Sequence, residues 1–166
     1  MIIRRETNRD VAAIRAITLA AFSDHPYSNA REHILIEALR QAQALTLSLV
    51  AETSDGIVGH IAFSPVAIAG MQHNWFGLGP LAVLPTQQRR GIGSDLVRQG
   101  LAQLQELGAR GCVLVGDPEF YRRFGFAPTP TLQLEGVPPS YFLALAFADD
   151  VPHGSVTYHP AFADVA

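Results

Sequence analysis

The sequence has 166 residues, of which 48% are hydrophobic and 16% are charged, and its formal net charge at pH 7 is −3. This length and composition predict one domain, residues 1–166, and the slightly acidic balance argues against non-specific binding to nucleic acid or to an anionic membrane. Cys112 is the only cysteine, which excludes a disulfide framework and a cysteine-based zinc site, and no metal is expected. Cys112 lies in an apolar run, so we interpret it as a small buried residue.

The sequence offers no targeting signal. Its amino-terminal residues include no long apolar segment of the kind that directs secretion, and no apolar run is long enough to span a bilayer. We therefore expect a cytoplasmic protein. No internal repeat, low-complexity tract or linker divides the chain.

The first part of the chain predicts one strand and two helices. Residues 2–5 form the strand, and Thr7 and Asp10 are spaced like a capping box that opens a helix. One face of that helix is apolar and contains Val11, Ile14, Ile17, Ala21 and Phe22. After a loop, Asn29 and Glu32 are spaced like the cap and third residue of a second helix. Its apolar stripe contains Ile34, Leu35, Ala38, Leu39 and Ala42.

The pattern then changes from helical spacing to alternation, which is typical of strands. Apolar residues occupy alternate positions from 45 to 51, and Asp55-Gly56 is a strong hairpin turn. Residues 57–69 form the return strand, with a bend expected at Pro65. A further turn leads to residues 75–83, the third strand of an antiparallel meander.

A polar loop follows and opens a helix whose apolar residues recur at three- and four-residue spacing: Ile92, Leu96, Val97, Leu101, Leu104 and Leu107. Gly108 is placed to cap the end of this helix. Gly91 and Gly93 lie where the first helical N–H groups have no intrahelical partner, and these groups attract an anion. Because glycine lacks a Cβ, a diphosphate can approach the backbone, and Arg89 and Arg90 add positive charge. The loop therefore predicts a phosphate cradle, although two glycines that open a helix also occur as a simple tight turn.

Two common phosphate-binding motifs do not fit this loop. A P-loop requires G-x-x-x-x-G-K-[ST], and no Lys-Ser or Lys-Thr follows these glycines. The dinucleotide fingerprint requires a third Gly or Ala at the position that Leu96 occupies. The pattern that does fit is Gln88-x-x-Gly91-x-Gly93 after an apolar strand.

The chain beyond the helix predicts further strands. Residues 112–115 are short and wholly apolar, as expected of a strand buried on both faces. A right-handed crossover makes this strand parallel to residues 75–83. Pro118 is well placed in the first turn of a short helix. In the proline-rich tail, residues 141–147 form a strand, either internal or part of a dimer seam, and residues 155–158 form a last one.

Two motifs carry a resemblance to a known family. Gln88-x-x-Gly91-x-Gly93 resembles the acyl-CoA signature Q/R-x-x-G-x-G/A of the GNAT family of N-acetyltransferases. Tyr121-Arg122-Arg123-Phe124-Gly125-Phe126 resembles the Y-x-R/K-x-G-F ending of the last conserved block of that family. The two motifs stand on either side of a helix and a buried strand, in the order and at the separation usual in the family. The run 116–121 is similar to the YhbS-like predicted acetyltransferases within GNAT, and the resemblance covers residues 2–126.

The resemblance implies an α/β (α+β) fold of the GNAT type. Its mixed central sheet has the element order β-α-α-β-β-β-α-β-α-β-β and a splayed pair of parallel strands, and the pantetheine arm of the cofactor enters the gap between them. Pro80 cannot donate to a strand ladder, so we expect a break in pairing or a bulge there. Either Pro80 marks this gap, which we favour, or it marks an edge of the sheet.

The resemblance also implies roles for individual residues, with acetyl-CoA as the cofactor. The expected cofactor-binding residues are Leu81, Ala82, Val83, Gln88, Arg89, Arg90, Gly91, Ile92, Gly93 and Ser94. Tyr121 would be the general acid for the leaving thiolate, because a phenol with a pKa near ~10 is protonated at neutral pH. The alternative for Tyr121 is an aromatic ring packed under the carboxy-terminal sheet.

The general base is where the sequence departs from the family. Many relatives carry a Glu on the strand before the glycine loop, and that position falls at about Gly77, which cannot accept a proton. His60 is the predicted catalytic base, with a satisfied histidine of the sheet as the alternative. Asp24, His25 and Glu32 are further candidates, for which a solvated loop or a cap is the other interpretation. No base is required if water relays the proton or if the amine has a low pKa.

The leading hypothesis is an N-acetyltransferase that moves acetyl from acetyl-CoA to a primary amine by direct attack in a ternary complex. A buried Cys112 argues against an acyl-cysteine route. The acceptor is a small-molecule or peptide amine, and a homodimer is one option for the assembly. The alternative is a non-catalytic module that binds or senses acyl-CoA, which the missing strand carboxylate favours and Tyr121 opposes. A third interpretation is an α/β domain whose loop binds no nucleotide.

Overall fold

The structure is a computed structural model that describes residues 1–23, 25–26 and 28–165. Its strands are β1 (Ile2–Arg5), β2 (Leu47–Thr53), β3 (Gly56–Ile68), β4 (Met71–Val83), β5 (Gly111–Val115), β6 (Leu132–Gln133), β7 (Phe142–Ala146) and β8 (Gly154–Tyr158). Its α-helices are α1 (Val11–Phe22), α2 (Glu32–Gln41), α3 (Ile92–Glu106) and α4 (Pro118–Tyr121). The predicted element order is confirmed, with the two-residue strand β6 added.

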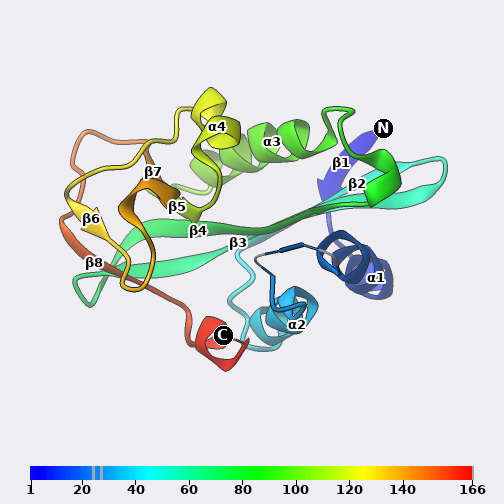
Figure 1. Cartoon of the computed structure of the whole chain (residues 1–166), viewed down its shortest axis with the longest axis horizontal. Coiled ribbons are helices and arrows are strands. Elements are labelled where there is room, and N and C mark those ends of the chain that lie inside the picture. Colours follow the sequence, from blue (N-terminus) through cyan, green and yellow to red (C-terminus); the bar gives the residue numbers. More distant parts are fainter. Residues whose placement is uncertain (24, 27, 166) are drawn as a thin grey trace.

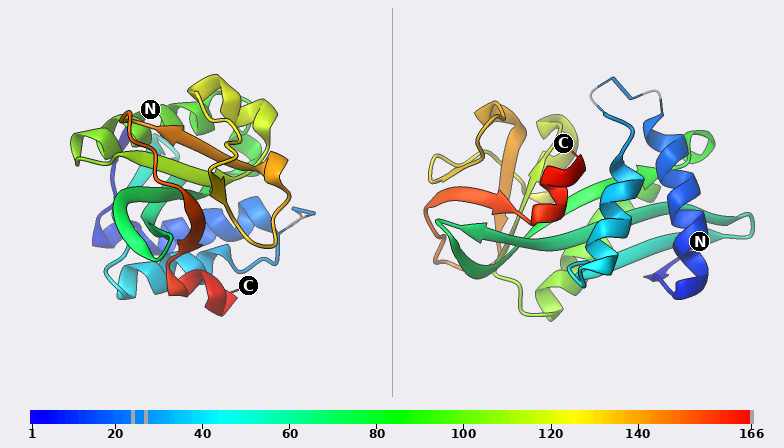
Figure 2. Two further views of the ribbon diagram at one scale, coloured as in Figure 1. Left: turned by 90° about the vertical axis from the view of Figure 1, so that its left-hand side faces the viewer. Right: turned by 90° about the horizontal axis from the view of Figure 1, so that it is seen from below.

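The strands form a twisted mixed sheet with helices on both faces (Figure 1). The strand order is β1-β2-β3-β4-β5-β7, and β4 and β5 are parallel neighbours. Helices α3 and α4 lie on one face, and α1 and α2 lie side by side on the other, as Figure 2 shows from below. Strand β8 pairs with residues 66–68 of β3, beyond the residues of β3 that pair with β2. None of the helices within the described residues is long and apolar enough to cross a bilayer.

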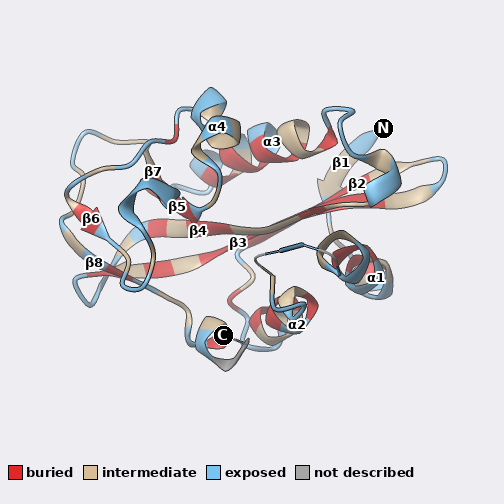
Figure 3. Cartoon of the chain, in the orientation of Figure 1, coloured by how far each residue is buried: buried red, intermediate tan, exposed pale blue. Residues whose placement is uncertain are grey.

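Apolar side chains fill the space between each helical layer and the sheet, and Figure 3 shows the buried residues along the strands and on the inner faces of the helices. On the α3 face, Phe63 of β3 packs so closely on Gly100 that an added Cβ would lie 2.6 Å from the ring. On the other face, Ile14 of α1 and Ile36 of α2 pack with Val50 of β2. A separate cluster around Trp75 joins the ends of β3 and β4 to the carboxy-terminal strands.

The structure corrects the predicted start of the second helix. Helix α2 begins at Glu32 with Arg31 at the cap position, so Asn29 is not the cap. Asn29 Oδ1 instead accepts the N–H of Arg31 at 3.0 Å, and the Glu32 carboxylate accepts the Ser28 hydroxyl at 2.7 Å. The side chain of Asn29 therefore forms a local turn, which is the usual competitor of a helix cap for this residue type.

The carboxy-terminal strands settle one of the alternatives left open by the sequence. Strand β7 pairs with β5 at the end of the strand order, so residues 141–147 do not form an internal strand of the sheet. On its other edge, β7 forms an isolated antiparallel bridge between Ala144 and Ala127. Strand β8 is longer by one residue than predicted and begins at Gly154.

Candidate active site

Strands β4 and β5 separate toward their carboxyl ends. They pair only over residues 75–77 of β4 and 111–113 of β5. Beyond this point β4 stays paired with β3, while Leu114 and Val115 of β5 stay paired with β7. The facing edges therefore carry backbone N–H and C=O groups that no ladder between them satisfies. The splay implied by the family resemblance is present in the structure.

Strand β4 carries a bulge at the point where it leaves β5. Gly79 and Pro80 lie together opposite the single residue Ala62 of β3. Pro80 has no N–H to donate, so an interruption of the ladder at this position is expected. The predicted irregularity is confirmed. Beyond the bulge, the side chains of Leu81 and Val83 point toward the start of α3.

A pocket of about 560 Å³ opens where the loop after β4 meets the start of α3. It is lined by Leu81, Val83, Gln87, Gln88, Arg89, Gly91, Ile92, Gly93, Ser94, Phe120 and Arg123. Of the predicted cofactor-binding residues, Ala82 and Arg90 do not line it. Ala82 is buried, and its side chain follows the opposite alternation from Leu81 and Val83. The exposed Arg90 donates from Nη1 to Gln87 Oε1 at 3.3 Å.

The start of α3 has the geometry of an anion site. Gly91 caps the helix with a φ of 83°, a conformation that favours glycine. The N–H groups of residues 92–94 follow it, and the first N–H groups of a helix have no intrahelical partner. An added Cβ on Gly93 would have its nearest neighbours 3.8–4.0 Å away, so the packing of the protein does not require glycine there. Gln88 ties the loop to β4 by donating from Nε2 to the Val83 carbonyl at 3.0 Å.

Sequence reasoning missed three residues of this pocket: Gln87, Phe120 and Arg123. Phe120 belongs to α4 and Arg123 to the 3-10 turn that follows, so both reach the pocket only through the tertiary fold. The Arg123 guanidinium lies 4.9 Å from the centre of the Phe120 ring. Arg123 belongs to the second motif, residues 121–126, and its place there was the one feature of the sequence that could have identified it. Arg89 and Arg123 give the pocket a positive charge on two sides.

Tyr121 ends α4 and packs close to β5. An added Cβ on Gly116, the residue after β5, would lie 2.6 Å from the Tyr121 ring, and the ring of Phe126 lies 6.0 Å away between centroids. Burial, with smaller effects of Cys112 and Asp117, raises the pKa of Tyr121 to about 12. The phenol is therefore protonated at neutral pH, which a general acid requires.

His60 lies on the other face of the sheet from this pocket, because its neighbours Gly59 and Ile61 point toward α3. It is fully buried, and its Nε2 lies 2.7 Å from the Ser48 hydroxyl. Glu6 Oε1 is 4.0 Å from the same nitrogen, and Arg40 pairs with Glu6 at 2.9 Å. Burial lowers the pKa of His60 to about 4, so the imidazole is neutral at neutral pH.

The remaining candidate bases lie around the first two helices. Asp24 falls outside the described residues. The His25 ring packs against Phe22, with 5.8 Å between centroids. The carboxylate of Glu32 is engaged with the Ser28 hydroxyl at the start of α2.

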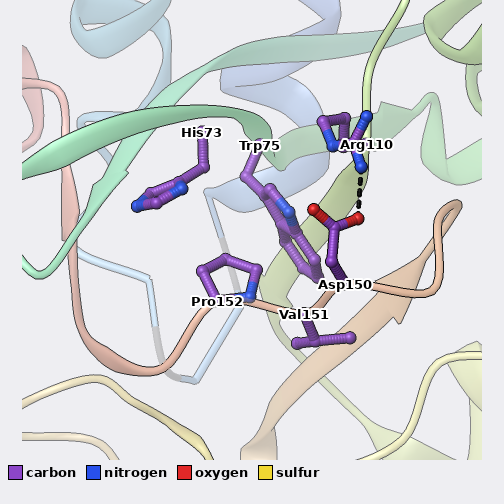
Figure 4. Close-up of a pocket in the computed structure, with 6 residues that line it drawn as sticks. All are labelled: His73, Trp75, Arg110, Asp150, Val151 and Pro152. Carbon is purple, nitrogen blue, oxygen red and sulfur yellow. Dashed lines mark hydrogen bonds and ion pairs between the residues drawn. The ribbon is translucent and has the colours of Figure 1, made fainter.

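A second pocket, of about 180 Å³, opens near the start of β4 (Figure 4). Its lining comprises His73, Trp75, Arg110, Asp150, Val151 and Pro152. Arg110 and Asp150 form an ion pair, and both side chains are largely exposed. Such pairs contribute little binding or stability, and neither sequence motif reaches this end of the sheet. Within the described residues, no group of three or more His, Cys, Asp or Glu side chains could hold a metal ion.

The splayed parallel strands and the pocket at the start of α3 are the features expected of a GNAT acyltransferase. A family model described as an acetyltransferase (GNAT) domain matches residues 44–128. The chain is 37% identical to the uncharacterised N-acetyltransferase YhbS of Escherichia coli K12 over 98% of each sequence. The chain therefore belongs to the GNAT family of acetyltransferases.

Two crystal structures of related proteins match nearly the whole chain. A GNAT family acetyltransferase from Brucella melitensis, in complex with acetyl-CoA, is 53% identical and has a TM-score of 0.88 over 97% of each chain. YhbS from Escherichia coli, in complex with CoA, is 34% identical and has a TM-score of 0.89, covering 98% of this chain and 91% of that one.

Proposed function

We propose that this protein transfers the acetyl group of acetyl-CoA to a primary amine. The carrying observation is that the unpaired edge of β4 leads directly into the positively charged pocket at the start of α3. The N–H groups of residues 92–94, with Arg89 and Arg123, suit a diphosphate, and backbone groups of Leu81 and Val83 suit an amide-rich pantetheine arm. The acetyl-CoA and CoA complexes of the two related proteins support this assignment.

Tyr121 is the general acid in this proposal. A neutral amine attacks the thioester carbonyl carbon, the C–N bond forms as the C–S bond breaks, and the Tyr121 hydroxyl gives its proton to the departing sulfur. The amine nitrogen loses one proton, which His60 accepts and passes on to solvent, and solvent returns one to the Tyr121 phenolate. The attack is direct, because Cys112 is fully buried and burial raises the pKa of its thiol well above the usual range.

His60 remains the predicted proton acceptor. Its neutral imidazole can accept a proton, and its Nδ1 has no hydrogen-bond partner among the described residues. A pKa of about 4 makes it a weak base, so we expect it to serve amines that are already neutral. If His60→Gln leaves the pH–rate profile unaltered, this role is wrong.

Thiol release from acetyl-CoA across a panel of amines tests the proposed function. Tyr121→Phe should lower turnover by about 100-fold or more, the usual contribution of a general acid, while the Kd for acetyl-CoA stays within about twofold. Tyr141→Phe is the matched control, because this tyrosine is 49% exposed. Unchanged turnover in Tyr121→Phe would remove this residue from the mechanism.

The same assay separates catalysis from cofactor sensing. Binding of acetyl-CoA without thiol release for every amine would favour a non-catalytic module. The protonated Tyr121 and the similarity to named N-acetyltransferases favour the enzyme.

A further inference from the structure

Three buried polar atoms lie on the sheet face opposite α3, two of them near Gly77 and the third four residues away along β3. They are His60 Nδ1, Ser64 Oγ and the Tyr158 hydroxyl, and each lacks a hydrogen-bond partner among the described residues. In β3, His60 and Ser64 alternate with Ile61 and Phe63, which belong to the core on the α3 face. An unpaired buried polar group is unfavourable, so the hydroxyls of Ser64 and Tyr158 are candidates for a contact with a bound molecule.

Tyr158 reaches this face from the last strand of the chain. It is paired with Val66 of β3, and its ring extends across β3 to β4. The ring edge lies 2.9 Å, and the carbon that bears the hydroxyl 3.4 Å, from the position of a Cβ on Gly77. Gly77 is the last residue of β4 that pairs with β5, and Ser64 is its direct partner in β3. The two hydroxyls therefore lie beside the point where the parallel strands separate.

The two tyrosines approach this point from opposite faces of the sheet. Tyr121 packs with the core on the α3 face, whereas Tyr158 packs with the cluster around Trp75. Cys112 of β5 pairs with Phe76 of β4, one residue before the last pair between these two strands. A thioester held in the gap would thus have Tyr121 on one side and Tyr158 on the other.

We propose that the hydroxyls of Tyr158 and Ser64 bind the attacking amine. The assignment rests on the proposed acetyl transfer and adds the acceptor side of that reaction. Each hydroxyl has lone pairs that accept an N–H hydrogen bond, and two such bonds direct the nitrogen lone pair into the gap. Neither hydroxyl takes a proton, and the amine proton passes to solvent after attack. Ser64 and the Tyr158 hydroxyl are fully buried whereas the Tyr158 ring is partly exposed, so in this proposal the acceptor enters past the ring.

This pair of hydroxyls selects a class of acceptor. It presents no negative charge to stabilise an ammonium ion, and the Glu6 carboxylate beside His60 is already paired with Arg40. At about pH 7.5, roughly a third of an α-amine with a pKa near ~7.8 is neutral, against roughly 0.1% of a lysine ε-amine with a pKa near ~10.4. The structure therefore points to an amine with a pKa near or below ~8, such as the α-amine of a peptide or of an amino-acid amide.

Tyr158→Phe tests the assignment because it removes only the hydroxyl. The ring remains over Gly77 and keeps its contact with Phe162, whose centroid is 4.8 Å away. With an amino-acid amide as acceptor, kcat/KM should fall by about tenfold or more, mainly through a higher KM for the amine. The KM for acetyl-CoA should not change, and the melting temperature should stay equal or rise, because the lost hydroxyl has no partner. Ser64→Ala should act in the same direction, and Tyr141→Phe is the control.

The substrate class is tested with wild-type protein and two acceptors. An amino-acid amide offers an α-amine, and Nα-acetyl-lysine, whose α-amine is blocked, offers only an ε-amine. We expect kcat/KM to favour the amide by at least the ratio of neutral fractions. Equal use of the two acceptors would overturn the assigned class. Thiol release that neither Tyr158→Phe nor Ser64→Ala alters would overturn the binding assignment alone, whereas absence of thiol release in the wild type with every amine would overturn the proposed function as well.

Discussion

Substitutions of Gly93 test the pocket at the start of α3, because the packing of the protein leaves room for a side chain there. The added Cβ would lie 3.8 Å from Val83, 3.9 Å from Leu81 and 4.0 Å from Phe120, all ordinary contact distances. Alanine is also a better helix former than glycine by up to about 1 kcal/mol. We therefore expect the free energy of unfolding of Gly93→Ala to equal or exceed that of the wild type.

The family signature allows Gly or Ala at this position, so Gly93→Ala should keep its affinity for acetyl-CoA, and a larger side chain is needed to test the diphosphate site. The branched side chain of Gly93→Val would occupy the space beside the N–H groups that we propose for the diphosphate and would push that group away from them. A hydrogen bond to a charged group contributes about 1.5–3 kcal/mol, and each 1.4 kcal/mol is about tenfold in affinity. Loss of one such bond should therefore raise the Kd for acetyl-CoA by roughly 10- to 100-fold.

Calorimetric titration with acetyl-CoA, together with urea unfolding, separates the two effects. Gln99→Ala, at an exposed position of the same helix, should change neither affinity nor pocket shape. Gly91→Ala is the contrasting variant: with a φ of 83°, alanine at this position should destabilise the protein by about 1–2 kcal/mol. Wild-type affinity in a folded Gly93→Val protein would refute the diphosphate assignment, and a loss of stability in Gly93→Ala would refute the packing argument.

Three buried groups give further expectations. Arg4 holds the pKa of Asp10 well below its usual range. Asp10→Asn should therefore lower the free energy of unfolding, measured in urea at neutral pH, by about 2–3 kcal/mol. The wild type should lose this stabilisation as the pH falls below about 4. Burial lowers the pKa of His60 to about 4. The free energy of unfolding should therefore fall by roughly 3 kcal/mol as the pH is lowered from about 6.5 to 4, and His60→Gln should not show this pH dependence. Cys112 should react with a thiol reagent only after denaturation, and Cys112→Ala should retain turnover; loss of turnover in a folded variant would reopen an acyl-cysteine route.

The sequence predicted the elements whose burial pattern is regular. Helix α3 and the meander of β2, β3 and β4 each bury a repeating set of apolar residues, so their spacing alone located them. Gly108 follows α3 with a φ of 91°, as expected of a glycine beyond the last turn. The start of α2 was wrong because Asn29 can cap a helix or form a local turn, and only the folded chain decides between these uses.

The site, too, combines residues that a local sequence pattern identifies with residues that only the folded chain brings together. The pocket residues from Gln88 to Ser94 are contiguous, so one motif identified most of them. Phe120, Arg123 and Tyr158 reach the site from other elements, and no local pattern marks a side chain that crosses a sheet to meet a partner distant in the sequence. Sequence reasoning could therefore recover the proposed donor side of the gap and not the proposed acceptor side.

Gly77 lies where β4 begins to separate from β5, under the ring of Tyr158. Read along β4 alone, a glycine at this position looks like the loss of a carboxylate, and it favoured a non-catalytic module. In the folded chain the ring of Tyr158 covers Gly77 so closely that even a methyl group there would lie 2.9 Å from it. A side chain at residue 77 and the ring of Tyr158 cannot share this space, so the glycine is the condition for a phenol from β8 to reach the strand gap. The missing carboxylate then fits the acceptor site that we propose, which takes amines that arrive without a charge.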